Sequence, residues 1–124
     1  MANPQKENGF TAIANELMEA LARIRIPGEA RQIVDTVIRR TYGYQKRFAV
    51  ITLQEFCEAT KLNKPAVVRA INKAILMNLI VIKKDNAGNK LYVFNKNYEI
   101  WKPLSKKITT LSKKITENSA RAAG

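Results

Sequence analysis

The sequence predicts one α+β domain with about four helices followed by a two-stranded β-hairpin. The chain has 124 residues, of which 46% are hydrophobic, and this amount suits a single packed core. Apolar residues recur at helical spacing in the first two thirds of the chain, and two β-branched runs then flank a loop rich in Gly, Asn and Lys. Two helix-capping signals lie close together just before these runs. Helices followed by a hairpin indicate the α+β class.

The first part of the chain predicts an arm and two helices. Residues 1–9 are polar and indicate a flexible N-terminal arm. We expect the first helix to be capped by Asn15, with an apolar side formed by Leu17, Met18, Leu21 and Ala22. Ile26-Pro27-Gly28 precedes the second helix, which Gly43 ends. One face of the second helix carries Ile33, Val34, Val37, Ile38 and Thr41. A basic turn at 44–47 then leads into a short strand within 48–51.

Two further helices follow with a short turn between them. Thr52-Leu53-Gln54-Glu55 matches the capping box, in which Thr and Glu each bond the other's backbone N–H, so a third helix starts at Leu53 and ends near 60–62. Its expected buried residues are Leu53, Phe56, Cys57 and Ala59. Asn63 then caps a fourth helix, with Pro65 in its first turn and its end at Asn78. The inner side of that helix is expected to hold Val67, Ala70, Ile71, Ala74 and Ile75.

The two β-branched runs, 79–82 and 91–94, predict a hairpin whose basic loop projects from the body. We expect Tyr98, Ile100 and Trp101 to pack back against the core, which makes residues 10–102 the folded domain. Residues 103–124 form a basic linker or tail. In it, Leu-Ser-Lys-Lys-Ile-Thr at 104–109 recurs at 111–116, a heptad repeat too short for a stable coiled coil.

Helix, turn, helix and hairpin in this order are typical of a winged helix-turn-helix, whose second helix of the pair enters the major groove of duplex DNA. Arg and Lys donate to guanine, Asn pairs with adenine, and small apolar side chains contact the thymine methyl. The predicted contacts on this recognition helix are Asn63, Lys64, Pro65, Ala66, Val68, Arg69, Asn72 and Lys73. No acidic residue lies among them.

The hairpin would act as the wing and contact the DNA backbone. Its predicted contacts are Lys83, Lys84, Asn86, Asn89 and Lys90. A further set of basic residues either contacts backbone phosphates or simply keeps the surface soluble, and the sequence favours neither role. That set is Lys6, Arg39, Arg40, Lys46 and Arg47.

Charge and composition narrow the function classes. The net charge is +12, of which residues 63–124 carry +10. Such a field attracts nucleic acid first and an anionic membrane surface second, and a merely soluble basic surface is the alternative. The chain has no His and a single cysteine, Cys57, so we expect no metal site, disulfide or cofactor. Dispersed glycines and unpaired acidic residues predict no enzyme. Without a signal peptide or membrane span, we expect a cytoplasmic protein.

Several segments resemble a known family. These are Asn8-Gly9-Phe10-Thr11, residues 15–21, Arg39-Arg40-Thr41-Tyr42-Gly43-Tyr44 and the 51–62 segment. Over residues 8–101 the sequence is similar to the N-terminal domain of replication protein O of lambdoid bacteriophages. The resemblance implies an origin-binding initiator that recognises repeated sites, acts as a dimer and recruits the helicase through a separate C-terminal region. Tyr44 departs from the Trp common in the family. The helicase-recruiting region is not expected in this chain, which is either a fragment or a shortened protein.

The expected function is therefore sequence-specific binding of duplex DNA at a phage replication origin, in the nucleoid of the bacterial host. Transcriptional repressors share the fold and form the first alternative. A module that grips an acidic protein partner with its wing and tail is the second. The tail repeat is either a basic linker or, as the resemblance suggests, a trace of origin repeats in the gene, because seven codons span two turns of DNA.

Overall fold

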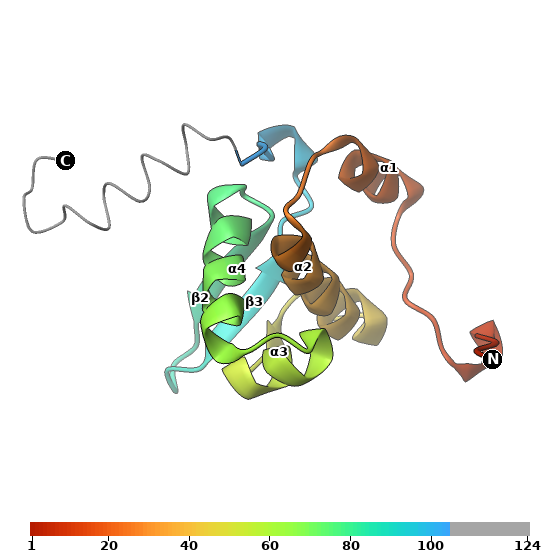
Figure 1. The fold of residues 1–124 in the computed structure, drawn as a ribbon, viewed down its shortest axis with the longest axis horizontal. Helices are drawn as coiled ribbons and strands as arrows, with labels where there is room; N and C mark the ends of the chain where they lie inside the picture. Colours follow the sequence, from red (N-terminus) through yellow and green to blue (C-terminus); the bar gives the residue numbers. More distant parts are fainter. Residues whose placement is uncertain (105–124) are drawn as a thin grey trace, which may run out of the picture.

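The structure, a computed structural model, describes residues 1–104, which form helices packed against a small sheet (Figure 1). The α+β class predicted from the sequence is confirmed in this part of the chain, and the predicted tail repeat beyond residue 104 lies outside it. The order of elements is compatible with a winged helix-turn-helix. The helices and strands are α1 (Asn15–Arg23), α2 (Gly28–Thr41), β1 (Ala49–Val50), α3 (Leu53–Thr60), α4 (Lys64–Leu76), β2 (Ile80–Lys84) and β3 (Lys90–Phe94).

The sheet has three antiparallel strands in the order β1-β3-β2. The sequence predicted a two-stranded hairpin and a separate short strand within 48–51, and the short strand pairs with β3 to widen the sheet. Ile80 lies opposite Phe94 in the ladder, and every second residue along each strand points to the same side of the sheet as this pair. Ile80 and Phe94 are buried, so this is the side covered by the helices.

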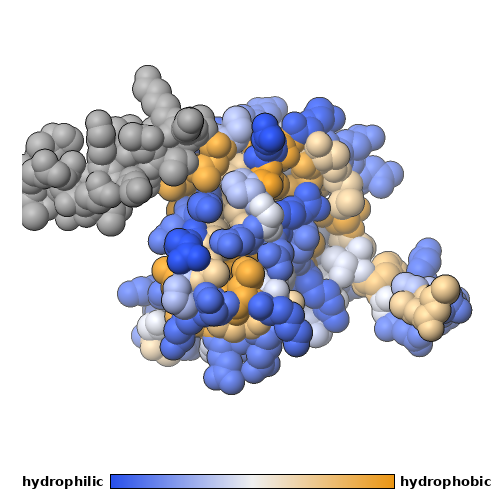
Figure 2. All heavy atoms as spheres, viewed as in Figure 1, coloured by the Kyte–Doolittle hydropathy of each residue, from blue (hydrophilic) through white to orange (hydrophobic). Residues whose placement is uncertain are grey.

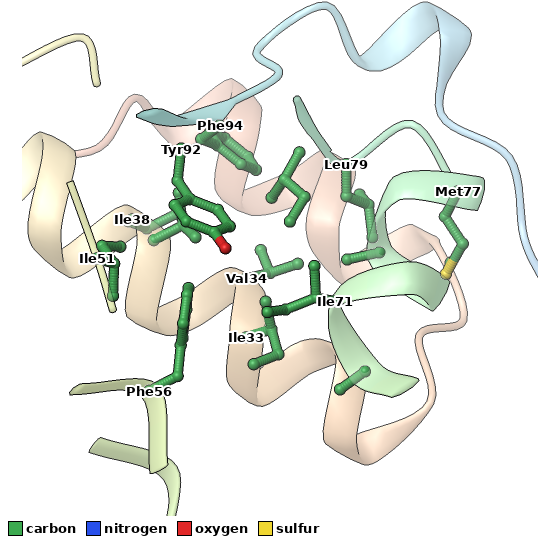
Figure 3. Close-up of a cluster of buried hydrophobic side chains, with 14 of the residues drawn as sticks. Ile33, Val34, Ile38, Ile51, Phe56, Ile71, Met77, Leu79, Tyr92 and Phe94 are labelled. Carbon is green, nitrogen blue, oxygen red and sulfur yellow. The ribbon is translucent and has the colours of Figure 1, made fainter. Parts of the chain in front are cut away.

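The core lies between the helices and the covered side of the sheet (Figure 3). Ile33 and Val34 of α2 are fully buried at its centre. Phe56 of α3 meets Tyr92 of β3 edge to face, with 5.0 Å between the ring centroids. Burial of each such side chain stabilises the fold by about 1.5–3 kcal/mol, so this contact fixes α3 on the sheet.

Local capping sets the two helices of the helix-turn-helix, as predicted. The backbone N–H of Glu55 donates to Thr52 Oγ1 at 3.1 Å, and the Thr52 N–H donates to Glu55 Oε1 at 2.9 Å. Asn63 Oδ1 accepts from the N–H of Ala66 at 2.9 Å. Between the helices, Lys61 adopts a left-handed conformation with φ of 64°, which ends α3 and turns the chain into α4.

Some predicted helix details are wrong. Ala14, not Asn15, is the N-cap of α1 and makes no side-chain cap bond. Helix α1 buries only a narrow side, so Met18 and Ala22 are exposed.

Two helix residues predicted to be buried are exposed. Ala59 lies beside the buried stripe of α3, and Thr60 takes its place in the core, where its hydroxyl donates to the Phe56 carbonyl at 2.7 Å. Ile75 lies roughly 110° around α4 from the centre of the buried stripe and is exposed. Leu53 and Cys57 are only partly buried.

The segment after β3 folds back as predicted and closes the domain. Trp101 Nε1 donates to the Asn95 carbonyl at 2.7 Å, and its ring lies 5.6 Å from that of Phe94. Asn78, with φ of 62°, ends the α4 region in the predicted left-handed conformation and donates to the carbonyl of Ile100. The side chain of Ile100 itself is exposed, contrary to the prediction. This segment therefore anchors the chain beside the C-terminal end of α4.

Candidate nucleic-acid interface

Helix α4 divides into a buried side and an exposed side. Val67, Ala70 and Ala74 are fully buried against the body. The opposite side presents Arg69 and Asn72 to solvent. The exposed side also includes Lys64, Pro65 and Val68. Figure 2 shows the face of the molecule that carries α2, α3 and α4, and hydrophilic side chains cover most of it.

The exposed side of α4 is basic and carries no counter-charge. The helix has no acidic residue in its sequence. In the part of the chain that the structure describes, the ion pairs are Arg31 with Asp35 and Arg40 with Glu55, so Arg69 is unpaired there. Its guanidinium thus keeps all five donors available. Val68 beside it is 42% exposed and gives this basic side of the helix an apolar position.

The structure corrects part of the predicted contact set on α4. Ala66 is buried, so its predicted exposure on this side of the helix is wrong. Asn63 uses its side-chain oxygen to cap the helix. Lys73 is half-buried on the flank of the exposed side.

Two residues that the sequence analysis missed adjoin this surface. Ile75, which was assigned to the core, extends the exposed side beyond Asn72. Lys61 is exposed at the turn that leads into α4. At 100° per residue Ile75 lies about 80° from Val67, so periodicity alone did not place it outside, and the left-handed Lys61 has no sequence signal either.

The strand register separates the predicted wing lysines. Lys84 lies directly opposite Lys90, on the sheet side that is covered by helices further along the strands. Lys83 lies opposite Leu91, on the other side. Two ammonium groups facing each other across a strand pair repel, and an anion between them would relieve the repulsion. Lys84 and Lys90 are therefore the wing lysines best placed for a phosphate.

The wing tip is folded by Asp85. Its Oδ1 accepts from the backbone N–H groups of Ala87 and Asn89, at 2.9 and 2.8 Å. The Asn89 side chain donates to Oδ2 at 3.2 Å, so this predicted DNA contact has a structural role in the loop. The bonds from the Asn89 backbone, followed by its side chain and the Ala87 backbone, lower the pKa of Asp85. The strands extend to Lys84 and Lys90, which makes the loop shorter than predicted and leaves Asn86 exposed on it.

The five other predicted phosphate contacts are not gathered at α4. Arg40 Nη1 donates to Glu55 Oε2 at 3.2 Å, and Nη2 donates to the Val50 carbonyl at 3.3 Å. The guanidinium of Arg39 lies over the ring of Tyr44, 4.9 Å from its centroid. Lys6 makes a similar contact with Phe10 in the N-terminal segment. Lys46 and Arg47 are exposed between α2 and β1. Arg40 thus links α2 to α3 and β1, and its predicted phosphate contact stays a prediction.

Comparison with known proteins gives consistent results. The family model described as bacteriophage replication protein O matches residues 3–101. Replication protein 15 of Enterobacteria phage phi80 is 29% identical over 94 residues, which cover 76% of this chain and 31% of that protein. DNA replication protein gp18 of Salmonella phage P22 is 31% identical over 96 residues, which cover 77% of this chain and 34% of that protein.

The chain thus spans about a third of the length of these two relatives. No solved structure matches it. Within residues 1–104, no helix has the length and apolar character needed to cross a membrane.

Proposed function

The chain belongs to the bacteriophage replication protein O family, and from this premise we propose that it binds duplex DNA in a sequence-specific manner through α4 and the β2–β3 hairpin. Family membership supports a role in phage DNA replication. The finer proposal is that the sites bound are repeats in a phage replication origin. Binding at them involves no catalysis, takes place in the host cytoplasm and brings two copies together on the DNA.

The observation that carries this proposal is the exposed side of α4. Arg69 and Asn72 project from a helix whose other side is fixed in the core by Val67 and Ala70. A rigid support matters because base readout needs donors held at a defined position along the groove. A helix also fits the width of the major groove, whereas the minor groove is too narrow for it.

Each exposed side chain has a distinct expected role. Arg69 donates two parallel hydrogen bonds to the O6 and N7 atoms of guanine, and Asn72 pairs with the N6 and N7 atoms of adenine. Val68 meets a thymine methyl. Lys84 and Lys90 contact phosphates on the flanking backbone, which contributes affinity but no sequence information.

Selection of bound duplexes from a random pool at stated salt tests the proposal. The wild-type chain should enrich one motif, and Asn72→Ala should relax the preference at one adenine while the rest of the motif persists. Arg25→Ala is the control, because Arg25 is an exposed basic residue on the segment between α1 and α2 and does not belong to α4. Its motif should equal that of the wild type. Recovery of no motif, or equal relaxation by both variants, would refute readout by α4.

A second measurement separates origin recognition from transcriptional repression. The enriched motif is compared with the sequence of the phage that encodes the chain. Clustered repeats of the motif in one replication region support the initiator. A single copy overlapping a promoter favours a repressor instead.

A further inference from the structure

An open groove of about 550 Å³ is lined by the segment that follows α2 and by the outward side of the β2–β3 hairpin. Its floor is apolar and includes Tyr42, Val81 and Val93. Val81 and Val93 are opposite each other in the β2–β3 ladder, and their neighbours Ile80 and Phe94 point to the core. Val81 is 41% exposed, so this apolar pair faces solvent. In Figure 1 the β2–β3 hairpin lies behind α4.

The rim of the groove is basic. Lys46 and Arg47 line it from the segment before β1, and Lys83 and Lys96 line it from the hairpin side. All four side chains are exposed, and no acidic residue lines the groove. The register that separates Lys83 from Lys84 explains this arrangement, because it turns Lys83 towards Val81 and away from the wing surface.

We propose that this groove binds an acidic peptide segment of a partner protein. A bulky apolar side chain of the segment covers Val81 and Val93, and flanking carboxylates pair with the four rim cations. This inference does not rest on DNA binding by α4. It assigns the predicted wing residue Lys83 to a protein contact.

Charge and apolar character together select this occupant. A second copy of the chain in a two-fold interface would set the same four cations against each other, which is unfavourable. The DNA backbone would satisfy the cations but has no apolar group to cover exposed Val81 and Val93. An acidic segment with an apolar anchor meets both requirements, as a polar rim around an apolar centre does in protein interfaces.

The placement of the groove also permits simultaneous binding of two partners. No residue of α4 lines the groove, and Val81 and Val93 face away from the helices, so α4 stays accessible when the groove is filled. A peptide bound there would therefore tether a second protein to the DNA site without competing for it.

The test titrates the isotope-labelled chain with an acetylated peptide, Glu-Glu-Leu-Phe-Glu-Glu, and follows backbone amide shifts by NMR. The shifts should cluster at Val81, Val93 and residues 45–47 and should saturate. Two control peptides replace either the Leu-Phe pair by Ser-Ser or the four Glu by Lys. Each should bind at least about tenfold more weakly, since each lacks one of the two complementary features.

Matched variants make the test specific. Val81→Asp and Lys96→Glu should each weaken peptide binding at least about tenfold. Val50→Asp is the control, because Val50 is 44% exposed on β1 but does not line the groove, and it should bind like the wild type. The amide spectrum of each variant establishes that it is folded.

Three results would overturn the proposal. The control peptides could bind as tightly as the acidic one, the shifts could map to α4 or be absent, or Val50→Asp could weaken binding as much as Val81→Asp. Duplex DNA added to the peptide complex should leave the groove shifts in place, and displacement of the peptide by DNA would instead identify a nucleic-acid surface. Binding of duplex DNA by α4 is measured without the peptide, and its result does not decide the peptide proposal.

Discussion

Two arginines of this domain have the same charge and opposite surroundings. Arg40, at the end of α2, donates to the Glu55 carboxylate and to the Val50 carbonyl. Arg69, on α4, points to solvent from a helix without acidic residues. The first joins three elements of the fold, whereas the second leaves its donors free. The comparison shows that a basic residue indicates a ligand only when the fold does not already use its charge.

The contrast is best tested by removing each guanidinium. Arg69→Ala should lower the affinity for the selected DNA site by about 5- to 150-fold, because a bidentate base contact contributes ~1–3 kcal/mol. Its unfolding free energy should change by less than about 0.5 kcal/mol, as expected for an exposed side chain. Fluorescence anisotropy and thermal unfolding provide the two measurements. An equal loss on random DNA would assign Arg69 to phosphate instead.

Arg40→Ala should lower the stability of the fold and leave the specific DNA affinity nearly unchanged, and its effect should be smaller than that of Arg69→Ala. We expect its unfolding free energy to fall by less than about 1 kcal/mol, since the ion pair with Glu55 is partly exposed and screened by solvent. Specific DNA affinity should stay within about twofold of the wild type at a temperature where both are folded. A loss of affinity comparable to that of Arg69→Ala would break the comparison and return Arg40 to the interface.

The wing allows the same comparison between neighbours. Lys84→Ala should weaken binding to specific and random DNA alike and reduce the slope of log affinity against log salt by about 1. Lys83→Ala should leave the slope unchanged, because the register turns Lys83 to the other side of the sheet. Titrations at several salt concentrations measure both slopes. Equal slopes for the two variants would contradict the separation of the two lysines.

The smallest expected effect concerns acid stability. The backbone N–H of Thr52 is the largest cause that lowers the pKa of Glu55, followed by the charge of Arg40. Because the pKa is lowered in the folded state, ionised Glu55 contributes to the free energy of unfolding at pH values above the ordinary pKa of Glu. This contribution is lost as the pH falls through the pKa of Glu55 in the folded protein. The wild type should therefore lose more stability than Glu55→Gln over that acidic interval. Parallel acid unfolding curves would contradict this account.

Features governed by neighbouring residues were predictable from the sequence. The capping box at Thr52 and Glu55 and the cap at Asn63 form within a single turn of chain, so their residue types nearly determine the geometry. The left-handed conformation of Asn78, which ends the α4 region, was likewise predictable from its residue type. These local signals place α3 and α4 and thus locate the helix that carries Arg69.

Features that depend on distant partners were not predictable. Arg40 looked like a free cation because Glu55 approaches it only in the fold. Ala66 looked exposed because the sequence does not show how far the buried side of α4 extends around the helix. The separation of Lys83 from Lys84 needs the strand register, since a shift of one residue would exchange their sides.

The left-handed Lys61 is the first residue of the short turn between α3 and α4. Its φ of 64° and ψ of 20° turn the chain at the end of α3, so the angle between the two helices depends in part on this pair of dihedrals. A β-branched residue there would be sterically disfavoured, and a glycine would loosen the turn. The orientation of α4 is therefore vulnerable to substitution at an exposed position outside the core.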